Sequence, residues 1–207
     1  MIFINLKTYG EGENSKVLNL VRMISGCVKE TGIAIIPVVQ TENAKACVGV
    51  LSGEIWVQHT DSPEVLIGLG VKGTFLNHSD HKLDLSRIIY LVSQCNGAGL
   101  KNMVFSANLE ELKKVVALKP DFVAYEPPEL IASPTTSVAR AKPKIISDAA
   151  EIAKEAGIPL IVGAGVKDME DVAKVAELGA VGVAVSSAVI NAEDPKKVVL
   201  ELAGGFK

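Results

Sequence analysis

The chain has 207 residues, of which 48% are hydrophobic and 22% are charged, and its formal net charge is −3. This balance is ordinary for a globular protein, and the length is enough for one sizeable core. The basic residues form no stripe, so the sequence does not predict nucleic-acid binding. No apolar run approaches the roughly 20 residues that span a bilayer, so we expect no membrane segment.

Three cysteines, Cys27, Cys47 and Cys95, are scattered along the chain without CxxC spacing. This distribution argues against a disulfide framework or a zinc site and is typical of a reducing cytosol. Met1 runs directly into an apolar segment without the basic region of a secretory signal. The sequence therefore predicts a cytoplasmic protein with no metal centre and no cofactor.

Apolar runs and helical periodicities alternate along the chain. The runs that predict buried strands cover residues 2–7, 33–38, 55–58, 73–76, 102–106, 122–125, 158–162 and 181–185. Segments with helical spacing lie between and after them, around residues 17–28, 44–51, 85–95, 109–116, 145–156 and 168–178, with further helices starting at 62 and 194. Ser62-Pro63 and Asp194-Pro195 have the N-cap and N1 pattern, Asp168 is a further expected N-cap, and Gly32 is an expected helix stop.

Eight strand–helix units in strict alternation predict parallel pairing with right-handed crossovers. The continuous apolar strands fit a sheet that is buried on both faces. No change of composition marks a boundary, so we expect an α/β fold, a single (β/α)8 TIM barrel of eight parallel strands with outer helices, as one domain over residues 1–207. An open doubly wound sheet is the alternative, but the glycine-rich turn that it predicts after the first strand is absent.

Polar residues at the carboxyl ends of the strands are the candidate site, because active groups of such barrels lie there. Asn5 and Lys7 follow the first strand, His78 the fourth and Glu126 the sixth. Glu126 is followed by two prolines that stop both helix and strand. A carboxylate before such a stiff loop suggests a base under a lid, which would run from Pro127 to about residue 135.

Glycines and serines follow the last two strands. Gly163-Ala164-Gly165 comes after the seventh strand and Ser186-Ser187 after the eighth. Small residues here resemble the phosphate site of many barrels, where exposed backbone N–H groups hold a dianion.

Three motifs stand in order on the expected strands: Asn5-Leu6-Lys7, Asn77-His78-Ser79, and the segment 125–131 with sequence YEPPELI. Together they resemble the signatures of the triosephosphate isomerase family, over the whole chain. Ala141-Lys142-Pro143, the glycine turn and the short length are similar to the compact archaeal-type branch.

The resemblance implies interconversion of dihydroxyacetone phosphate and D-glyceraldehyde 3-phosphate, a step of glycolysis and gluconeogenesis. It implies that Glu126 is the base, that neutral His78 polarises the carbonyl oxygen, that Lys7 supplies positive charge and that Asn5 donates to the substrate oxygen. It also implies substrate and phosphate binding by a further set of residues, which comprises Ile131, Ala132, Gly163, Gly165, Ser186 and Ser187.

The sequence departs from the family pattern at several positions. The lid tip is Ala132-Ser133-Pro134 where Gly-Thr-Gly is usual, Asp80 replaces a glutamate, and Ala184 replaces a leucine. One methylene less at Asp80 is expected to lengthen or break its contact with Lys7. Members of the family assemble as dimers or tetramers, so the resemblance implies a homodimer or a homotetramer.

Other functions are open from the residues alone. A metal-dependent sugar-phosphate epimerase would need histidine and aspartate ligands at strand ends, and these are missing. A Schiff-base aldolase would need a lysine on a central strand such as the sixth, where this chain has Glu126. A catalytically silent phosphate-ligand-binding barrel is the third alternative; the departures at the lid tip keep it open, and the presence of Asn5, Lys7, His78 and Glu126 together argues against it.

Overall fold

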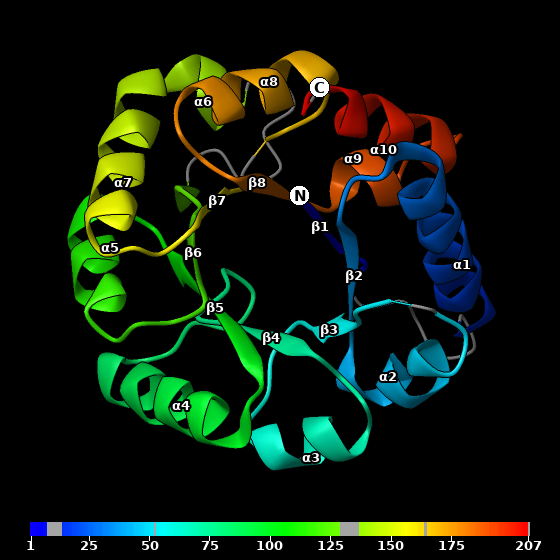
Figure 1. Cartoon of the computed structure of the whole chain (residues 1–207), viewed down its shortest axis with the longest axis horizontal. Helices are drawn as coiled ribbons and strands as arrows, with labels where there is room; N and C mark the ends of the chain where they lie inside the picture. Colours follow the sequence, from blue (N-terminus) through cyan, green and yellow to red (C-terminus); the bar gives the residue numbers. More distant parts are fainter. Residues whose placement is uncertain (8–13, 52, 129–136, 164, 207) are drawn as a thin grey trace.

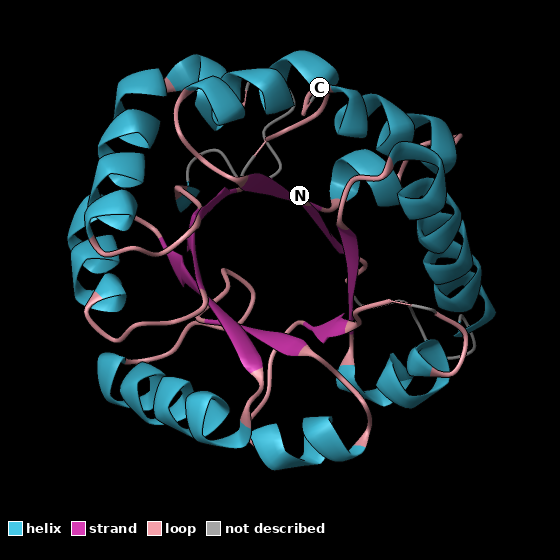
Figure 2. Ribbon diagram, in the orientation of Figure 1, coloured by secondary structure: helices cyan, strands magenta, loops and turns pink. Residues whose placement is uncertain are grey.

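The computed structural model describes residues 1–7, 14–51, 53–128, 137–163 and 165–206. Eight parallel strands close into a barrel in the order β1 to β8, with helices around it (Figure 1, Figure 2). The barrel closes where β1 pairs with β8, with Ile2 opposite Val183. This architecture confirms the predicted α/β fold and the closed (β/α)8 barrel.

The strands are short and almost entirely buried. They are β1 (Ile2–Asn5), β2 (Ile35–Val39), β3 (Trp56–Val57), β4 (Gly73–Leu76), β5 (Lys101–Ser106), β6 (Phe122–Tyr125), β7 (Leu160–Val162) and β8 (Gly182–Val185). The first strand ends two residues earlier than predicted, because Lys7 has a φ of 53° that no strand allows. The third strand is two residues shorter than predicted.

The helices include two that the sequence did not predict, α6 and α9. Within the described residues the helices are α1 (Asn14–Thr31), α2 (Thr41–Val48), α3 (Pro63–Gly68), α4 (Leu85–Ala98), α5 (Leu109–Val116), α6 (Val138–Ala141), α7 (Pro143–Glu155), α8 (Met169–Glu177), α9 (Ser187–Ile190) and α10 (Pro195–Gly204). Both unpredicted helices have only four residues, too few for an apolar period to show.

Helices start at all three positions that the sequence signals predicted, and at two of them the N-cap side chain makes a capping hydrogen bond. The side chains of Asp168 and Asp194 accept hydrogen bonds from the N–H groups of Asp171 and Lys197, as N-caps do. Ser62 precedes Pro63 at the start of α3, but its side chain makes no capping bond. The expected stop at Gly32 is confirmed, since Gly32 has a φ of 71° after the last residue of α1.

An aromatic cluster fills the inside of the barrel. Phe3 and Trp56 meet edge to face with ring centroids 5.0 Å apart, and Phe75 lies 4.8 Å from Phe105. Gly73 makes room for the indole, because a Cβ there would lie 2.2 Å from the Trp56 ring. This packed interior supports the strand ends where the polar residues stand.

The outer layer holds the three cysteines, which are free and buried. Burial raises the pKa of the Cys47 thiol to about 11 and that of Cys95 to about 12, so both stay protonated at neutral pH. Within the described ranges, none of the helices is both long and apolar enough to cross a membrane.

Candidate active site

A cavity of about 540 Å³ opens where the strands end. It brings together seven of the ten residues that the sequence predicted for the site, from the ends of β1, β4, β6 and β8 and from the turn after β7. These are Asn5, Lys7, His78, Glu126, Gly165, Ser186 and Ser187. Residues 180 positions apart in the chain thus face one space.

Glu126 stands directly after β6 and continues its alternation, so it shares the inward direction of Ala124, which belongs to the inner cluster. Its backbone N–H donates to the Ser106 carbonyl at 2.9 Å, which ties it to the end of β5. Its side chain is 12% exposed, and Oε1 lies 3.9 Å from Nε2 of His78. The Glu126 carboxylate therefore lies on the cavity wall, next to the imidazole ring of His78.

His78 is held by its two aromatic neighbours and by a turn. Its ring meets Phe105 edge to face at 4.7 Å and stacks on Phe75 at 6.0 Å. The Asp80 backbone N–H donates to Nδ1 at 3.3 Å. Because Nδ1 accepts, a neutral ring carries its proton on Nε2, the atom that faces Glu126.

Burial lowers the pKa of His78 below its ordinary value, as the largest influence on that group. The carboxylates of Glu126 and Asp80 act in the opposite direction and raise the pKa, while Lys7 and Lys82 lower it. The net direction is downward, so the neutral form is favoured. The turn at residues 79–80 thus supplies the N–H group that the ring accepts.

Asn5 and Lys7 form a compact unit at the end of β1. The Lys7 backbone N–H donates to Oδ1 of Asn5 at 3.0 Å, which orients the amide. Nδ2 of Asn5 is then a buried donor without a partner in the described part of the chain. Such a group costs free energy unless a ligand satisfies it, so Asn5 is ready to donate into the cavity. The positive φ of Lys7 is a second strained feature at the same point.

A polar chain from β2 and β3 reaches Lys7. Gln40 hydrogen-bonds Gln58, and Nε2 of Gln58 donates to Oδ2 of Asp80 at 3.0 Å. The same carboxylate oxygen lies 3.9 Å from Nζ of Lys7. This is at the outer limit for an ion pair, and both side chains are about half exposed, so the Lys7 charge is only weakly neutralised.

Gly165 and the two serines lie at the other end of the site. Gly165 has a φ of 71°, a conformation that glycine adopts without strain. The Ser186 hydroxyl donates to the Asn5 carbonyl at 2.7 Å, so its proton is already used. The exposed Ser187 hydroxyl has no partner among the residues described, which leaves it able to donate.

Three predicted site residues do not line the cavity in the described structure. Gly163 lies against Glu126 instead. A Cβ at position 163 would stand 3.2 Å from Oε1 of Glu126, so the absence of a side chain there leaves space for that carboxylate. Ile131 and Ala132 lie outside the described residues, as does most of the expected lid.

Sequence reasoning missed several cavity residues, of which Lys167 carries the only charge. The others are Phe75, Ser79, Val166, Ala184, Val185, Ala188, Asn191 and Val198. Ala184 had been noted only as a departure. Lys167 could have been suspected from its place two residues after Gly165, directly before the helix cap Asp168.

Asn77, next to His78, braces β4 against β5. Its Nδ2 donates to the Phe105 carbonyl at 2.8 Å and to Oε1 of Glu111 at 2.7 Å, and its Oδ1 accepts from the Leu83 N–H at 3.0 Å. Asn77 has a φ of 57°, which these three bonds hold in place. The strain at Asn77 fixes the direction in which His78 leaves the strand.

The fold and this cavity define a (β/α)8-barrel enzyme with a carboxylate and a neutral imidazole arranged for proton transfer. The sequence model of the family described as triosephosphate isomerase matches residues 1–202. The chain belongs to the triosephosphate isomerase family. Its reaction is therefore the interconversion of dihydroxyacetone phosphate and D-glyceraldehyde 3-phosphate, a step of glycolysis.

Individual relatives agree with this assignment. The chain is 36% identical to the triosephosphate isomerase of Thermoplasma volcanium, over 82% of this chain and 83% of that protein. It is 34% identical to the enzyme of Archaeoglobus fulgidus, over 82% of each chain, and 30% identical to that of Metallosphaera sedula, over 99% and 95%. These archaeal relatives fit the compact branch that the sequence resembled.

A solved structure shares the fold at low sequence identity. Thiamine phosphate pyrophosphorylase from Pyrococcus furiosus superimposes with a TM-score of 0.65 and 19% identity, and the match covers 97% of this chain and 92% of that one. At this identity the likeness shows the barrel fold alone.

Proposed function

We propose that Glu126 is the base that moves a proton between the two carbons of the triose phosphate, through an enediolate. The observation that carries the proposal is the approach of its Oε1 to His78 Nε2 at 3.9 Å on one cavity wall. Removing a proton beside a carbonyl places negative charge on the oxygen, so the site needs one base and donors near that oxygen. The two side chains supply these parts.

His78 acts as the neutral donor to the developing oxyanion. Its Nδ1 accepts from the Asp80 N–H at 3.3 Å, so Nε2–H is the proton that faces the substrate. A neutral imidazole is poised to donate and to take a proton back as the two oxygens exchange roles. Asn5 adds a second donor through Nδ2, whose lack of a protein partner supports this role.

Lys7 provides fixed positive charge between the reacting carbons and the phosphate. Its loose contact with Asp80, 3.9 Å long, leaves most of that charge for the ligand. At the far end of the cavity, Gly165 and Ser187 offer a backbone N–H and a hydroxyl to the phosphate group. Ser186 holds the end of β8 to Asn5 and so keeps the two ends of the cavity at a fixed separation.

Further parts of the proposal concern the protein as a whole. The family match over residues 1–202 supports one barrel domain that covers residues 1–207. We propose a homodimer or a homotetramer in the cytoplasm. Five exposed apolar side chains on the neighbouring helices α3 and α4 are available for such an interface: Val65, Ile67, Leu85, Ile89 and Tyr90.

The experiment is a coupled assay of glyceraldehyde 3-phosphate isomerisation with the wild type and Glu126→Asp. Withdrawing the carboxylate by one methylene should lower kcat by a factor on the order of 10² or more, because proton transfer depends on the approach of the base. Circular dichroism checks that the fold is kept. A Glu126→Asp variant with wild-type kcat would contradict the assignment of the base. Size-exclusion chromatography with light scattering tests the assembly, and a monomer would contradict it.

A further inference from the structure

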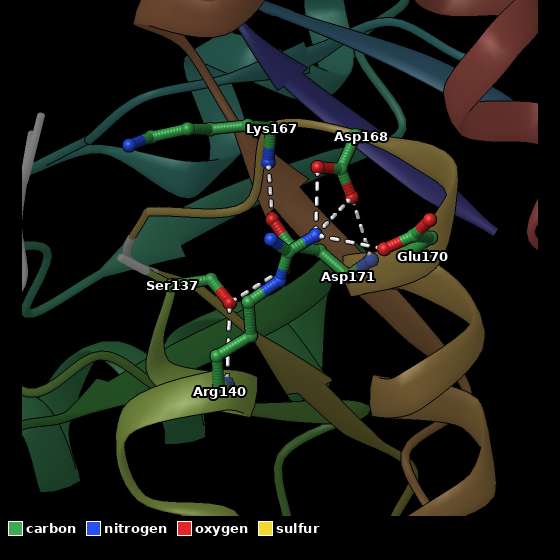
Figure 3. A network of polar contacts seen from close by, with 6 residues as sticks. All are labelled: Ser137, Arg140, Lys167, Asp168, Glu170 and Asp171. Atoms are coloured by element: carbon green, nitrogen blue, oxygen red, sulfur yellow. Dashed lines mark hydrogen bonds and ion pairs between the residues drawn. The ribbon is translucent and has the colours of Figure 1, made fainter. Parts of the chain in front are cut away.

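Lys167 is a cation on the cavity wall that the proposed mechanism does not use. It lies two residues after Gly165 and is half buried. Its ammonium group forms no ion pair with any residue of the described ranges. Figure 3 shows its side chain extending away from the neighbouring acidic residues, while its backbone N–H points to Asp171.

Without Lys167, the charged side chains on the cavity wall would not balance the charge of the substrate. Among the described lining residues, Lys7 and Lys167 are positive and Glu126 is negative. A triose phosphate carries close to two negative charges at neutral pH, and Lys7 alone only balances Glu126. A second cation is what a dianion requires in a partly closed site.

We propose that Lys167 is a phosphate-binding residue of this site and that the buried carboxylate of Asp171 positions it. The proposal rests on the phosphate end described above, at Gly165 and Ser187. The proposal adds Lys167 to the phosphate end as a cation, and Asp171 as the residue that positions it.

Asp171 fixes the backbone of Lys167. Its Oδ2 accepts the Lys167 N–H at 3.0 Å, and its Oδ1 accepts from the Ser137 hydroxyl at 2.6 Å and lies 2.7 Å from Nε of Arg140 (Figure 3). The side chain of Asp171 is only 2% exposed. A carboxylate so deeply buried holds its partners firmly, because each lost bond would leave a desolvated charge. The turn that carries Lys167 is thereby tied to the start of α6.

Arg140 forms ion pairs with the acidic side chains near Lys167, which could otherwise pair with the Lys167 ammonium group. It contacts Asp168 at 2.7 Å and Glu170 at 3.4 Å in addition to Asp171. Asp168 also caps α8 by accepting the Asp171 N–H at 2.8 Å. These carboxylates are therefore engaged with Arg140 and with the helix start, and the Lys167 ammonium group stays available to a ligand.

The test compares Lys167→Met and Lys167→Arg with the wild type on two substrates. The first is D-glyceraldehyde 3-phosphate and the second is D-glyceraldehyde, which lacks the phosphate. Inhibition by inorganic phosphate reports the phosphate end directly. Lys154→Met, an exposed lysine on the outer helix α7, is the matched control for the loss of one surface charge.

Lys167→Met should raise both the KM for the phosphorylated substrate and the inhibition constant of inorganic phosphate by about tenfold, the effect of one charge-assisted contact. Its kcat/KM for D-glyceraldehyde should stay at the wild-type value. Lys167→Arg should keep most of the wild-type affinity, and Lys154→Met all of it. Competition by inorganic phosphate in the wild type with an unchanged constant in Lys167→Met would overturn the role of Lys167 and leave the phosphate end intact. No competition in the wild type would overturn both.

A double variant tests the positioning role of Asp171. Asp171→Asn should weaken inorganic phosphate binding in the wild-type background by several-fold and have no further effect in the Lys167→Met background, since the two residues then act through one contact. If Asp171→Asn and Lys167→Met weaken phosphate binding independently, their effects multiply in the double variant. This result would overturn the positioning role of Asp171. A merely structural loss would instead lower the kcat/KM for D-glyceraldehyde, and that result would also overturn it.

Discussion

The two ends of the cavity are built in different ways. The proposed proton-transfer end, which comprises Asn5, Lys7, His78 and Glu126, consists of side chains that stand at strand ends. His78 and Asn5 are 6% and 4% exposed, and both are fixed by hydrogen bonds to the backbone. The proposed phosphate end comprises Gly165 and Lys167 in the turn after β7 and Ser186 and Ser187 at the start of α9, and it offers backbone N–H groups, a hydroxyl and an ammonium group.

This difference reflects what each end has to do. Proton transfer needs a base and a donor within a few tenths of an ångström of the productive position, and strands with packed neighbours give that precision. A phosphate group is held by several weaker contacts, so no single one has to be exact. We therefore expect changes at the proton-transfer end to lower kcat, and changes at the phosphate end to raise KM.

Glu126→Gln should give the largest effect. Loss of the base is expected to lower kcat by about 10²- to 10⁴-fold, the usual contribution of a general base. Inhibition by inorganic phosphate should not weaken, because the phosphate end is intact and the substitution removes a negative charge from the cavity. Glu177→Gln, which removes an exposed carboxylate that pairs with Lys174, is the control for charge. Weaker phosphate inhibition in Glu126→Gln would show that the two ends are not separate.

His78→Gln should come next. The glutamine side chain keeps a donor but cannot shuttle a proton, so we expect kcat to fall by about 10²-fold, with KM nearly unchanged. Steady-state kinetics in both directions of the reaction measure this. A larger change in KM than in kcat would place His78 in substrate binding instead of in proton transfer.

Gly165→Ala should act on the phosphate end and on stability together. An alanine at a φ of 71° costs about 1 kcal/mol of strain, which shifts the turn that carries the Gly165 N–H. We expect a rise in KM for the phosphorylated substrate and a lower free energy of unfolding in urea. Gly157→Ala, at a φ of 72° after the end of α7, is the matched control. It should lose the same stability without any change in KM.

Asp80→Asn should have a small effect, of a few-fold on kcat/KM. The contact with Lys7 is 3.9 Å long and both side chains are about half exposed, so its loss removes little attraction. Gln58 can still donate to the asparagine oxygen. A loss of 100-fold would mean that the Asp80 carboxylate itself takes part in the reaction.

The smallest predicted effect concerns pH and stability. Because the pKa of His78 is lowered in the folded protein, the unfolded chain binds a proton first as the pH falls. The contribution of this group is complete above the unfolded pKa of about 6.5 and is lost as the pH falls from there to the lowered folded value. Urea unfolding of the wild type and His78→Gln at pH 5 to 8 measures the difference. An equal slope in both proteins would contradict the lowered pKa.

Of the residues that line the cavity, the sequence predicted more at the proposed proton-transfer end than at the proposed phosphate end, for a physical reason. Glu126 and His78 follow apolar strands that are easy to find, and a barrel places every strand end on one rim. Gly163 and Gly165 gave the same signal, but only the structure shows that Gly163 makes room for Glu126 while Gly165 lines the cavity.

Lys167 could be suspected from its place two residues after Gly165 but not assigned to the cavity, because a lysine before the helix cap Asp168 also has the pattern of an ordinary surface residue. Its place on the cavity depends on the contacts of Arg140 in α6 with Asp168 and Asp171 at the start of α8, more than 25 residues away in the chain. The fold was predictable to the level of all eight strands. The missed helices α6 and α9 are too short to show a period.

The central claim is that Glu126 transfers the proton, and isomerisation in deuterium oxide tests it most directly. A carboxylate base exchanges its proton with solvent during the life of the enediolate, so product from the wild type should carry deuterium on the carbon that Glu126 protonates. Glu126→Gln should lose isomerisation and this exchange together. Deuterium exchange at the wild-type rate in a folded Glu126→Gln protein would contradict the claim.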